Sequence, residues 1–291
     1  MQSRQPMLMA VPNVSEGRDP AVIAAIAGAF APARLLDTHS DPDHGRSVFT
    51  LAAPQGEMAR ALVNGAREAI ERIDLTAHSG DHPHVGAIDV APVVYLDLGR
   101  RGAACAEALT AAALMGDELE LPVFLYGELA RGRERADIRR GGLEGLAKSG
   151  LVPDFGPRTL DPRKGAVLVA ARPPLVAFNI DLATDDLELA RRIAAEIREA
   201  GGGLPGVRAI GLYLPARGCA QVSTNVHDHS AAPLAELVRR VEQRAPVANL
   251  ELVGLAPAAA LAGLDHTGFR TIEKALGSEA GHGTDEEEAP A

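Results

Sequence analysis

The sequence predicts a mixed α/β (α+β) protein built from two ferredoxin-like subdomains, each with the element order βαββαβ. Two observations support this fold class. Short apolar runs rich in β-branched residues alternate with longer runs of helical periodicity, and the same succession of six elements occurs once in each half of the chain. At 291 residues the chain is long enough for two domains that each bury a core.

The first half of the chain contains the first set of six elements. Asp19 and Pro20 mark the start of its first helix, because aspartate is a favoured N-cap and proline suits the first helical position. The helices of this set are expected at residues 19–31 and 54–72. A further helix at 102–117 and a strand at 121–126 are expected to follow the six elements. The strands are expected at residues 7–11, 33–38, 46–52 and 87–97.

The second half repeats this order after a connector at about residues 130–165. Its strands are expected at residues 174–182, 207–214, 218–225 and 247–254, and its helices at 184–200 and 231–244. We therefore place the two subdomains at residues 1–173 and 174–276. Residues 277–291 hold five acidic residues and no Lys or Arg, which predicts a disordered acidic tail.

The connector has two interpretations. Its glycines and prolines are typical of a plain linker. Its length exceeds what two touching domains need, however, and long ordered loops tend to be binding loops. We favour the binding interpretation.

Composition excludes several classes of protein. The net charge of −10 argues against a nucleic-acid surface, because neutralising phosphates requires clustered Lys and Arg. Two cysteines, Cys105 and Cys219, cannot form a disulfide framework and favour a reducing compartment. There is no apolar signal core at the N-terminus and no run of 18 uncharged apolar residues. We expect a cytoplasmic protein without a membrane partner.

Residues 78–90 form a polar loop that leads into an apolar strand and carries the clearest chemistry. The loop holds His78, His82 and His84, and histidine can exchange protons near neutral pH. A metal site is the alternative, since His78 and His82 are four residues apart. That spacing brings two imidazoles together only on a helix, and Gly80 and Pro83 disfavour a helix here. We therefore expect acid/base chemistry and no metal.

Six segments of the chain resemble, in the same order, segments of the glutamate formiminotransferase family. They cover residues 11–17, 78–90, 122–128, 152–157, 177–180 and 220–225, so that the resemblance extends from about residue 10 to about residue 255. It implies two α/β subdomains with tetrahydrofolate bound in a ligand groove between them. It also implies that His82, in the Gly-acidic-His-Pro pattern of the loop, is the catalytic acid/base. Asp37, Asp41 or Asp89 could orient this histidine.

The resemblance further implies two folate-binding segments. These comprise Gly156, Pro157, Arg158, Thr159, Leu160, Asp161, Pro162, Arg163, Lys164 and Gly165, and then Gly206, Val207, Arg208, Ala209, Ile210 and Gly211. Both folate and formiminoglutamate carry carboxylates, which favour guanidinium or ammonium partners. The candidates for that role are Arg18, Arg46, Arg163, Lys164 and Arg208.

Four residues are candidates for binding a substrate, the pterin or the amine: Asn13, Glu16, His39 and Arg46. Asn13 and Glu16 have a second interpretation, because such residues also cap and turn the chain into a following helix. The sequence leaves both interpretations open.

The function that the resemblance implies is tetrahydrofolate-dependent glutamate formimidoyl transfer. The formimino group would move between N-formimino-L-glutamate and N5 of tetrahydrofolate in histidine degradation. The alternatives are a transferase that uses another formimino or formyl donor such as formiminoglycine, a non-catalytic folate-binding protein, and a metal-dependent hydrolase of formiminoglutamate. The resemblance also implies a homodimer. Because the vertebrate proteins continue into a cyclodeaminase domain, we expect a separate cyclodeaminase partner downstream.

Overall fold

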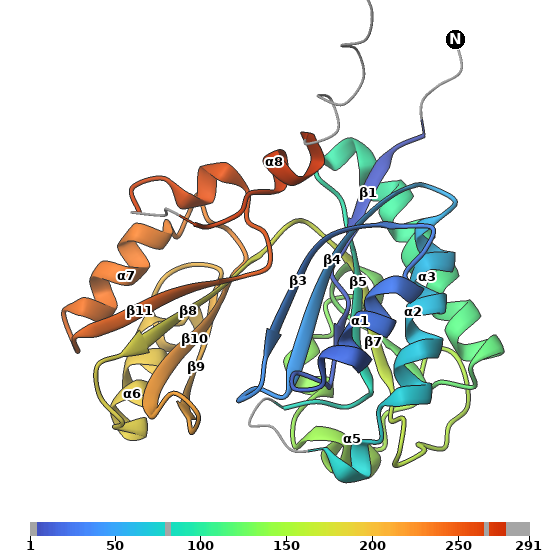
Figure 1. Ribbon diagram of the computed structural model, residues 1–291, viewed down its shortest axis with the longest axis horizontal. Helices are drawn as coiled ribbons and strands as arrows, with labels where there is room; N and C mark the ends of the chain where they lie inside the picture. Colours follow the sequence, from blue (N-terminus) through green and yellow to red (C-terminus); the bar gives the residue numbers. More distant parts are fainter. Residues whose placement is uncertain (1–4, 79–82, 265–267, 278–291) are drawn as a thin grey trace, which may run out of the picture.

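The computed structural model describes residues 5–78, 83–264 and 268–277. It contains two β-sheets, each with its long helices on one face, and the opposite faces of the sheets are turned toward each other (Figure 1). The chain passes from the first sheet to the second at residues 173–175. The predicted α/β fold with two subdomains is confirmed.

The N-terminal sheet is seven-stranded and mixed. Its strands are β1 (Met7–Ala10), β2 (Asn13–Val14), β3 (Arg34–Asp41), β4 (Arg46–Pro54), β5 (Ile88–Val94), β6 (Val123–Leu125) and β7 (Val167–Arg172). Both β1 and β2 pair with β4 on one side and β5 on the other, so they act as one strand interrupted at residues 11–12. Beyond β5 the sheet continues with the parallel strands β7 and β6, and β3 lies at the opposite edge beside β4.

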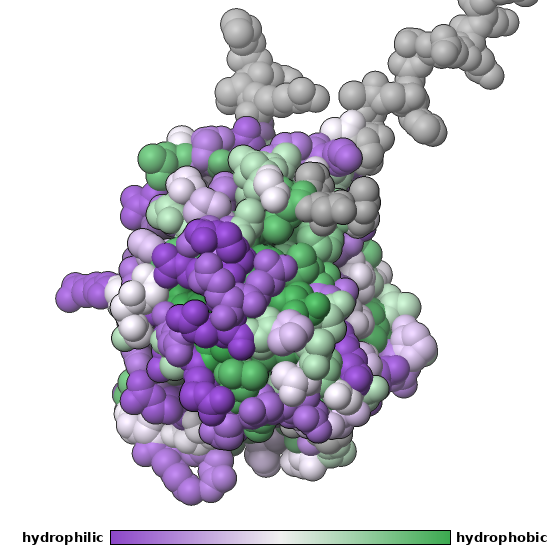
Figure 2. Space-filling model, turned by 90° about the vertical axis from the view of Figure 1, so that its left-hand side faces the viewer, coloured by the Kyte–Doolittle hydropathy of each residue, from purple (hydrophilic) through white to green (hydrophobic). Residues whose placement is uncertain are grey.

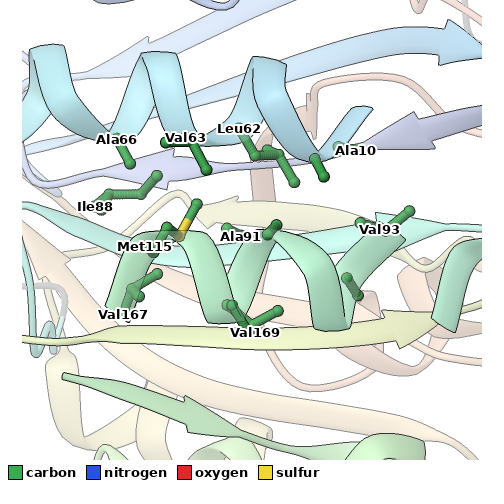
Figure 3. Close-up of a cluster of buried hydrophobic side chains, with 14 of the residues drawn as sticks. Ala10, Leu62, Val63, Ala66, Ile88, Ala91, Val93, Met115, Val167 and Val169 are labelled. Carbon is green, nitrogen blue, oxygen red and sulfur yellow. The ribbon is translucent and has the colours of Figure 1, made fainter. Parts of the chain in front are cut away.

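Three helices cover one face of this sheet: α1 (Pro20–Ala29), α2 (Met58–Arg72) and α3 (Arg101–Glu118). The predicted N-cap is present, because the side chain of Asp19 accepts hydrogen bonds from the backbone of Ala21 and Val22. Figure 3 shows Leu62 of α2 and Met115 of α3 meeting strand residues such as Val169 in a shared core. Burial of such apolar surface is the main force that holds the helices on the sheet.

The C-terminal sheet contains β8 (Val176–Leu182), β9 (Val207–Leu214), β10 (Cys219–Val226) and β11 (Val247–Val253). Its strand order is β11-β8-β10-β9 with antiparallel neighbours, and α6 (Leu187–Ile197) and α7 (Leu234–Glu242) pack on its outer face. The six elements follow the predicted order. Figure 2 shows the side of the molecule that carries α6 and α7, where hydrophilic and hydrophobic residues are mixed. The ferredoxin-like designation of the two subdomains stays a prediction.

The connector is more structured than a plain linker. It contains α4 (Arg135–Ile138) and α5 (Gly142–Lys148). The strand β7, which follows the connector and lies between β5 and β6, was not predicted from the sequence. Ile138 and Leu146 pack against Leu168 and Ala170 of β7, so α4 and α5 cover part of the face of the N-terminal sheet that lies opposite α1, α2 and α3. Short apolar runs such as that of β7 lack a period that separates strand from helix or loop.

Short elements complete the chain. They are η1 (Leu75–Ala77), η2 (Leu98–Arg100), η3 (Gly127–Ala130), η4 (Glu199–Gly201), η5 (Ala258–Leu261) and α8 (Ile272–Gly277). Within the described residues, no helix has the length and apolar character needed to cross a membrane. The predicted acidic tail, apart from its first residue Gly277, lies outside the described residues, and the predicted subdomain boundaries stay predictions.

Candidate functional site

The space between the two sheets forms a groove with two adjoining cavities, of about 110 and 470 Å³. The volume of the larger one lies within the ~300–1,000 Å³ that small-molecule sites usually occupy. The two cavities adjoin each other, because they share six lining residues: Arg135, Arg139, Arg172, Leu175, Ser223 and Asn225.

Strand alternation decides which side chains reach the groove. Successive residues of a strand point to opposite faces of its sheet. On β4, Val48 and Thr50 therefore line the groove, whereas Phe49 and Leu51 lie in the core under the helices. On β10, Ser223 and Asn225 reach the groove in the same way.

The dominant charge in the groove is positive. The side chains of Arg46 and Arg139 are only 13% and 10% exposed. Burial, followed by the repulsion of Arg139, lowers the pKa of Arg46 to about 9, which is still well above neutral pH. Burial likewise lowers the pKa of Arg139 and Arg172. A carboxylate ligand would restore part of the solvation that these buried guanidinium groups have lost.

Two arginines keep donors that the protein does not use. The buried Nε atoms of Arg139 and Arg172 have no hydrogen-bond partner among the described residues. Arg172 Nη1 donates to the carbonyl of Pro173 at 3.0 Å, and no ion pair joins Arg172 to a carboxylate in the part of the chain that the structure describes. An unsatisfied buried donor needs a physical explanation, and hydrogen bonding to a ligand is one that fits side chains lining a groove.

Asp89 balances part of this charge. It is 2% exposed, and its Oδ2 accepts a hydrogen bond from Nη2 of Arg139 and lies 3.9 Å from Nη2 of Arg46. Arg46 Nη2 also donates to Oδ1 of Asn13. Among the described residues, the groove therefore holds a buried cluster in which the carboxylate of Asp89 lies beside two guanidinium groups, those of Arg46 and Arg139.

The structure brings three of the four predicted substrate-binding residues together. Asn13, His39 and Arg46 all line the smaller cavity. Glu16 is not among the lining residues, and its Oε1 instead accepts hydrogen bonds from the backbone of Arg18 at 2.6 Å and Asp19 at 3.1 Å. This geometry matches the local turn-forming interpretation of Glu16.

The two predicted folate-binding segments differ in their position. Arg208, Ala209 and Ile210 line the larger cavity. In the segment 156–165, Arg163 pairs with Asp74 and Lys164 Nζ donates to the carbonyl of Leu119, beside the helices of the N-terminal subdomain. Segment 156–165 supplies no lining residue to either cavity of the groove.

His82 lies outside the described residues, but residues on both sides of it can be placed. Pro83 lines the larger cavity. His78 and His84 line a third cavity, smaller than the two in the groove, which Asp89 also borders. The ring centroids of the two histidines are 4.3 Å apart. Burial, and next the charge of His84, lowers the pKa of His78. The loop thus joins the described structure beside the buried arginine cluster.

The three acidic residues considered as partners of His82 have different surroundings. Asp37 pairs with Arg270, and Asp41 pairs with Arg217. Asp89 accepts a hydrogen bond from the backbone N–H of Val85 at 2.9 Å, three residues beyond His82. Within the described part of the chain, no group of three or more His, Cys, Asp or Glu residues is arranged to hold a metal ion.

Several residues that line the groove were not predicted from the sequence. These are Arg135, Arg139 and Arg172, with Asn179, Ser223 and Asn225 from the second sheet. Asn179, Ser223 and Asn225 do lie in segments that carry the family resemblance. The arginines of the connector had no such signal, because only the fold of the connector carries Arg135 and Arg139 to the groove.

Comparison with known proteins identifies the family. Residues 7–172 match the model of the formiminotransferase domain, N-terminal subdomain, and residues 177–269 match that of the formiminotransferase domain. A glutamate formimidoyltransferase from Streptococcus pyogenes is 39% identical over 86% of this chain and 89% of its own length. The formimidoyltransferase-cyclodeaminase of Sus scrofa is also 39% identical, over 89% of this chain, which spans about half (51%) of that protein.

Solved structures add nothing to this result. A microcompartment protein from Desulfitobacterium hafniense DCB aligns with 85% of this chain and 94% of its own, but at 11% identity and a TM-score of 0.24.

The two family matches together cover nearly all of the described residues. The chain belongs to the formiminotransferase family.

Proposed function

We propose that this protein is a glutamate formimidoyltransferase that moves the formimino group of N-formimino-L-glutamate to N5 of tetrahydrofolate, as a step of histidine degradation. The observation that carries the proposal is a groove of buried arginines between the two sheets of a formiminotransferase-family chain. Both substrates are carboxylates, and buried guanidinium groups suit them.

The reaction needs proton transfer more than it needs a strong nucleophile. N5 of tetrahydrofolate adds to the formimino carbon and forms a tetrahedral adduct. The bond from that carbon to the nitrogen of glutamate then breaks. The incoming nitrogen loses one proton and the departing nitrogen gains one, so a single group that works near neutral pH can serve both steps.

His82 is the proposed acid/base. The family resemblance supports this role, and so does the position of Pro83, which lines the larger cavity next to His82 in the sequence. Arg139 and Arg172 are the proposed partners of substrate carboxylates, since both line the two cavities and keep unused buried donors. Asn13, His39 and Arg46 are proposed to contact the donor.

Tetrahydrofolate is proposed to lie along the larger cavity. Arg208, Ala209 and Ile210 support this placement because they line it. The cavity volume of about 470 Å³ suits an extended organic ligand. For the segment 156–165, contact with folate stays a prediction, as does the role of Glu16. The homodimer, the cytoplasmic location and the separate cyclodeaminase partner are also retained as predictions from the sequence.

The function is tested by mixing purified protein with formiminoglutamate and tetrahydrofolate. Acidification converts the product to methenyltetrahydrofolate, whose absorbance is followed. We expect a signal that requires tetrahydrofolate, is unaffected by a chelator, and falls at least 100-fold in His82→Ala. Formiminoglycine and a formyl donor are assayed in parallel.

Three outcomes would contradict the proposal. Turnover with formiminoglycine but not formiminoglutamate would replace the donor. Folate-independent release of glutamate that a chelator abolishes would indicate a hydrolase. Folate binding without turnover of any donor would indicate a binding protein.

A further inference from the structure

Asp89 occupies an irregular position in β5. In the pairing of β2 with β5, Asn13 lies opposite Val90 and Val14 lies opposite Ile88, so the register passes over Asp89. An extra residue of this kind is a β-bulge, which turns a side chain away from its regular direction and is frequent beside active sites. Asp89 consequently borders the third cavity, which His78 and His84 line together with Arg46.

The carboxylate connects three parts of the chain. It accepts hydrogen bonds from the backbone N–H of Val85 at 2.9 Å and from Nη2 of Arg139 in the connector. It also forms an ion pair with Arg46, at the start of β4, at 3.9 Å. Val85 is itself fixed, because its carbonyl accepts the N–H of Ala166 at 2.9 Å. A buried carboxylate with several such partners holds each of them in one orientation.

The orientation matters most for Arg139. Its Nη2 group is directed to Asp89, while its buried Nε has no partner in the described structure and the side chain lines both cavities. A guanidinium is a rigid planar fork, so anchoring one nitrogen determines where the others point. Asp89 thereby restricts how Arg139, which lines both cavities, presents its guanidinium group to the groove.

We propose that Asp89 is a positioning residue that holds Arg139, with Arg46 beside it, in the orientation that binds a carboxylate of the ligand. This inference rests on the proposed function for the identity of the ligand. It goes further by naming a residue that acts through Arg139 on the affinity of the groove for anions.

The substitution Asp89→Asn separates positioning from simple charge. If Asp89 acted only through its charge, its removal would make the groove more positive and anions would bind more tightly. If Asp89 positions Arg139, asparagine releases the guanidinium and binding weakens, although the amide oxygen can still accept the N–H of Val85. We expect the Kd for L-glutamate and for folic acid, measured by calorimetry, to rise at least tenfold.

A second variant and a control guard against simple loss of folding. Arg139→Lys keeps the positive charge but loses the fork, and we expect it to weaken binding by a similar factor. Glu107→Gln alters another buried carboxylate, which caps α2 on the helical side of the sheet, and should leave both Kd values unchanged. Binding that is unchanged or tighter in Asp89→Asn would overturn the inference.

Failure of this inference can be told apart from failure of the proposed function. A wild-type protein that binds both ligands but transfers no formimino group refutes the reaction, and the Asp89→Asn binding result still decides the inference. An active wild-type enzyme whose binding and turnover survive both Asp89→Asn and Arg139→Lys refutes only the inference. A wild-type protein that binds neither ligand refutes both.

Discussion

At the scale of single residues, buried charged groups have specific partners. Glu107 of α3 is 7% exposed and accepts the backbone N–H groups of Gly56 at 2.7 Å and Ala59 at 2.8 Å. It thus caps the start of α2 from a neighbouring helix, a place where Glu57 offers no side-chain cap. Negative charge at a helix N-terminus is favourable.

Glu107→Ala should therefore lower the free energy of unfolding by about 1–3 kcal/mol, because it leaves two backbone donors without their acceptor. Urea denaturation at pH 7 measures this loss. Transferase activity should not change in the folded protein. An unfolding free energy equal to that of the wild type would show that the cap contributes nothing.

The pKa of His78 predicts a dependence of stability on pH. Burial lowers this pKa below the ordinary value of 6.5, so the folded state favours the neutral ring. As the pH falls below 6.5, His78 binds its proton more readily in the unfolded state than in the folded state. The stability present above pH 6.5 is therefore lost as the pH falls from 6.5 through the lower pKa of the folded state. His78→Gln should lose less stability than the wild type between pH 7.5 and 5.5, measured by urea denaturation.

His229→Gln, in a loop of the C-terminal subdomain, is the matched control. The same pH dependence in all three proteins would contradict the account.

At the scale of elements, backbone contact fixes the segment that leads into β5. Gly86 pairs with Gly165, and a Cβ atom on Gly86 would overlap the carbonyl oxygen of Ala166. Gly86→Ala should cost about 3 kcal/mol of unfolding free energy, since both sides of the contact are backbone. Gly102→Ala, in α3, meets open space and should raise stability slightly or leave it unchanged. Equal stability of the two variants would contradict the packing described.

Much of the element order could be predicted from the sequence, and the reason is local. Asp19 and Pro20 mark the start of α1 through capping chemistry that needs no tertiary context. β7 had no such signal, because its short apolar run acquires its place only by pairing with β5 and β6. The same limit applies to Asp89, whose direction depends on a bulge that only strand pairing creates.

At the scale of the whole molecule, the two subdomains are joined at both ends of the groove. At one end Met9 and Val94 of the N-terminal sheet pack with Leu255 and Ile272 of the C-terminal part. At the other end Arg217, in the turn after β9, donates to Asp41 of β3 at 2.6 Å, and it is held in place by a second bond, at 3.1 Å, to Asp181 of its own sheet. One contact is apolar and the other is polar.

Removal of the polar contact should loosen the groove. Arg217→Gln should lower the free energy of unfolding by about 2 kcal/mol, between the ~1 kcal/mol of exposed ion pairs and the ~3–5 kcal/mol of buried ones. The radius of gyration from solution scattering should rise, and the KM for both substrates should increase. Arg191→Gln removes an exposed pair with Glu188 on α6 and should change none of these quantities. Unaltered scattering and kinetics in Arg217→Gln would show that the contact does not hold the groove closed.

The candidate site could be predicted only in part. Asn13, His39 and Arg46 were predicted and do line the groove. The arginines that dominate its charge, Arg139 and Arg172, come from the connector and from β7, which are far apart in the sequence and meet only in the folded chain.

The most direct test of formimino transfer in this groove is the rate of methenyltetrahydrofolate formation by the wild type and by Arg172→Gln. The substitution removes a buried guanidinium whose Nε has no protein partner among the described residues, so the variant should be at least as stable as the wild type. We predict folate-dependent transfer by the wild type and at least a 100-fold lower kcat/KM in Arg172→Gln. An inactive wild type, or a variant with full activity, would contradict the account.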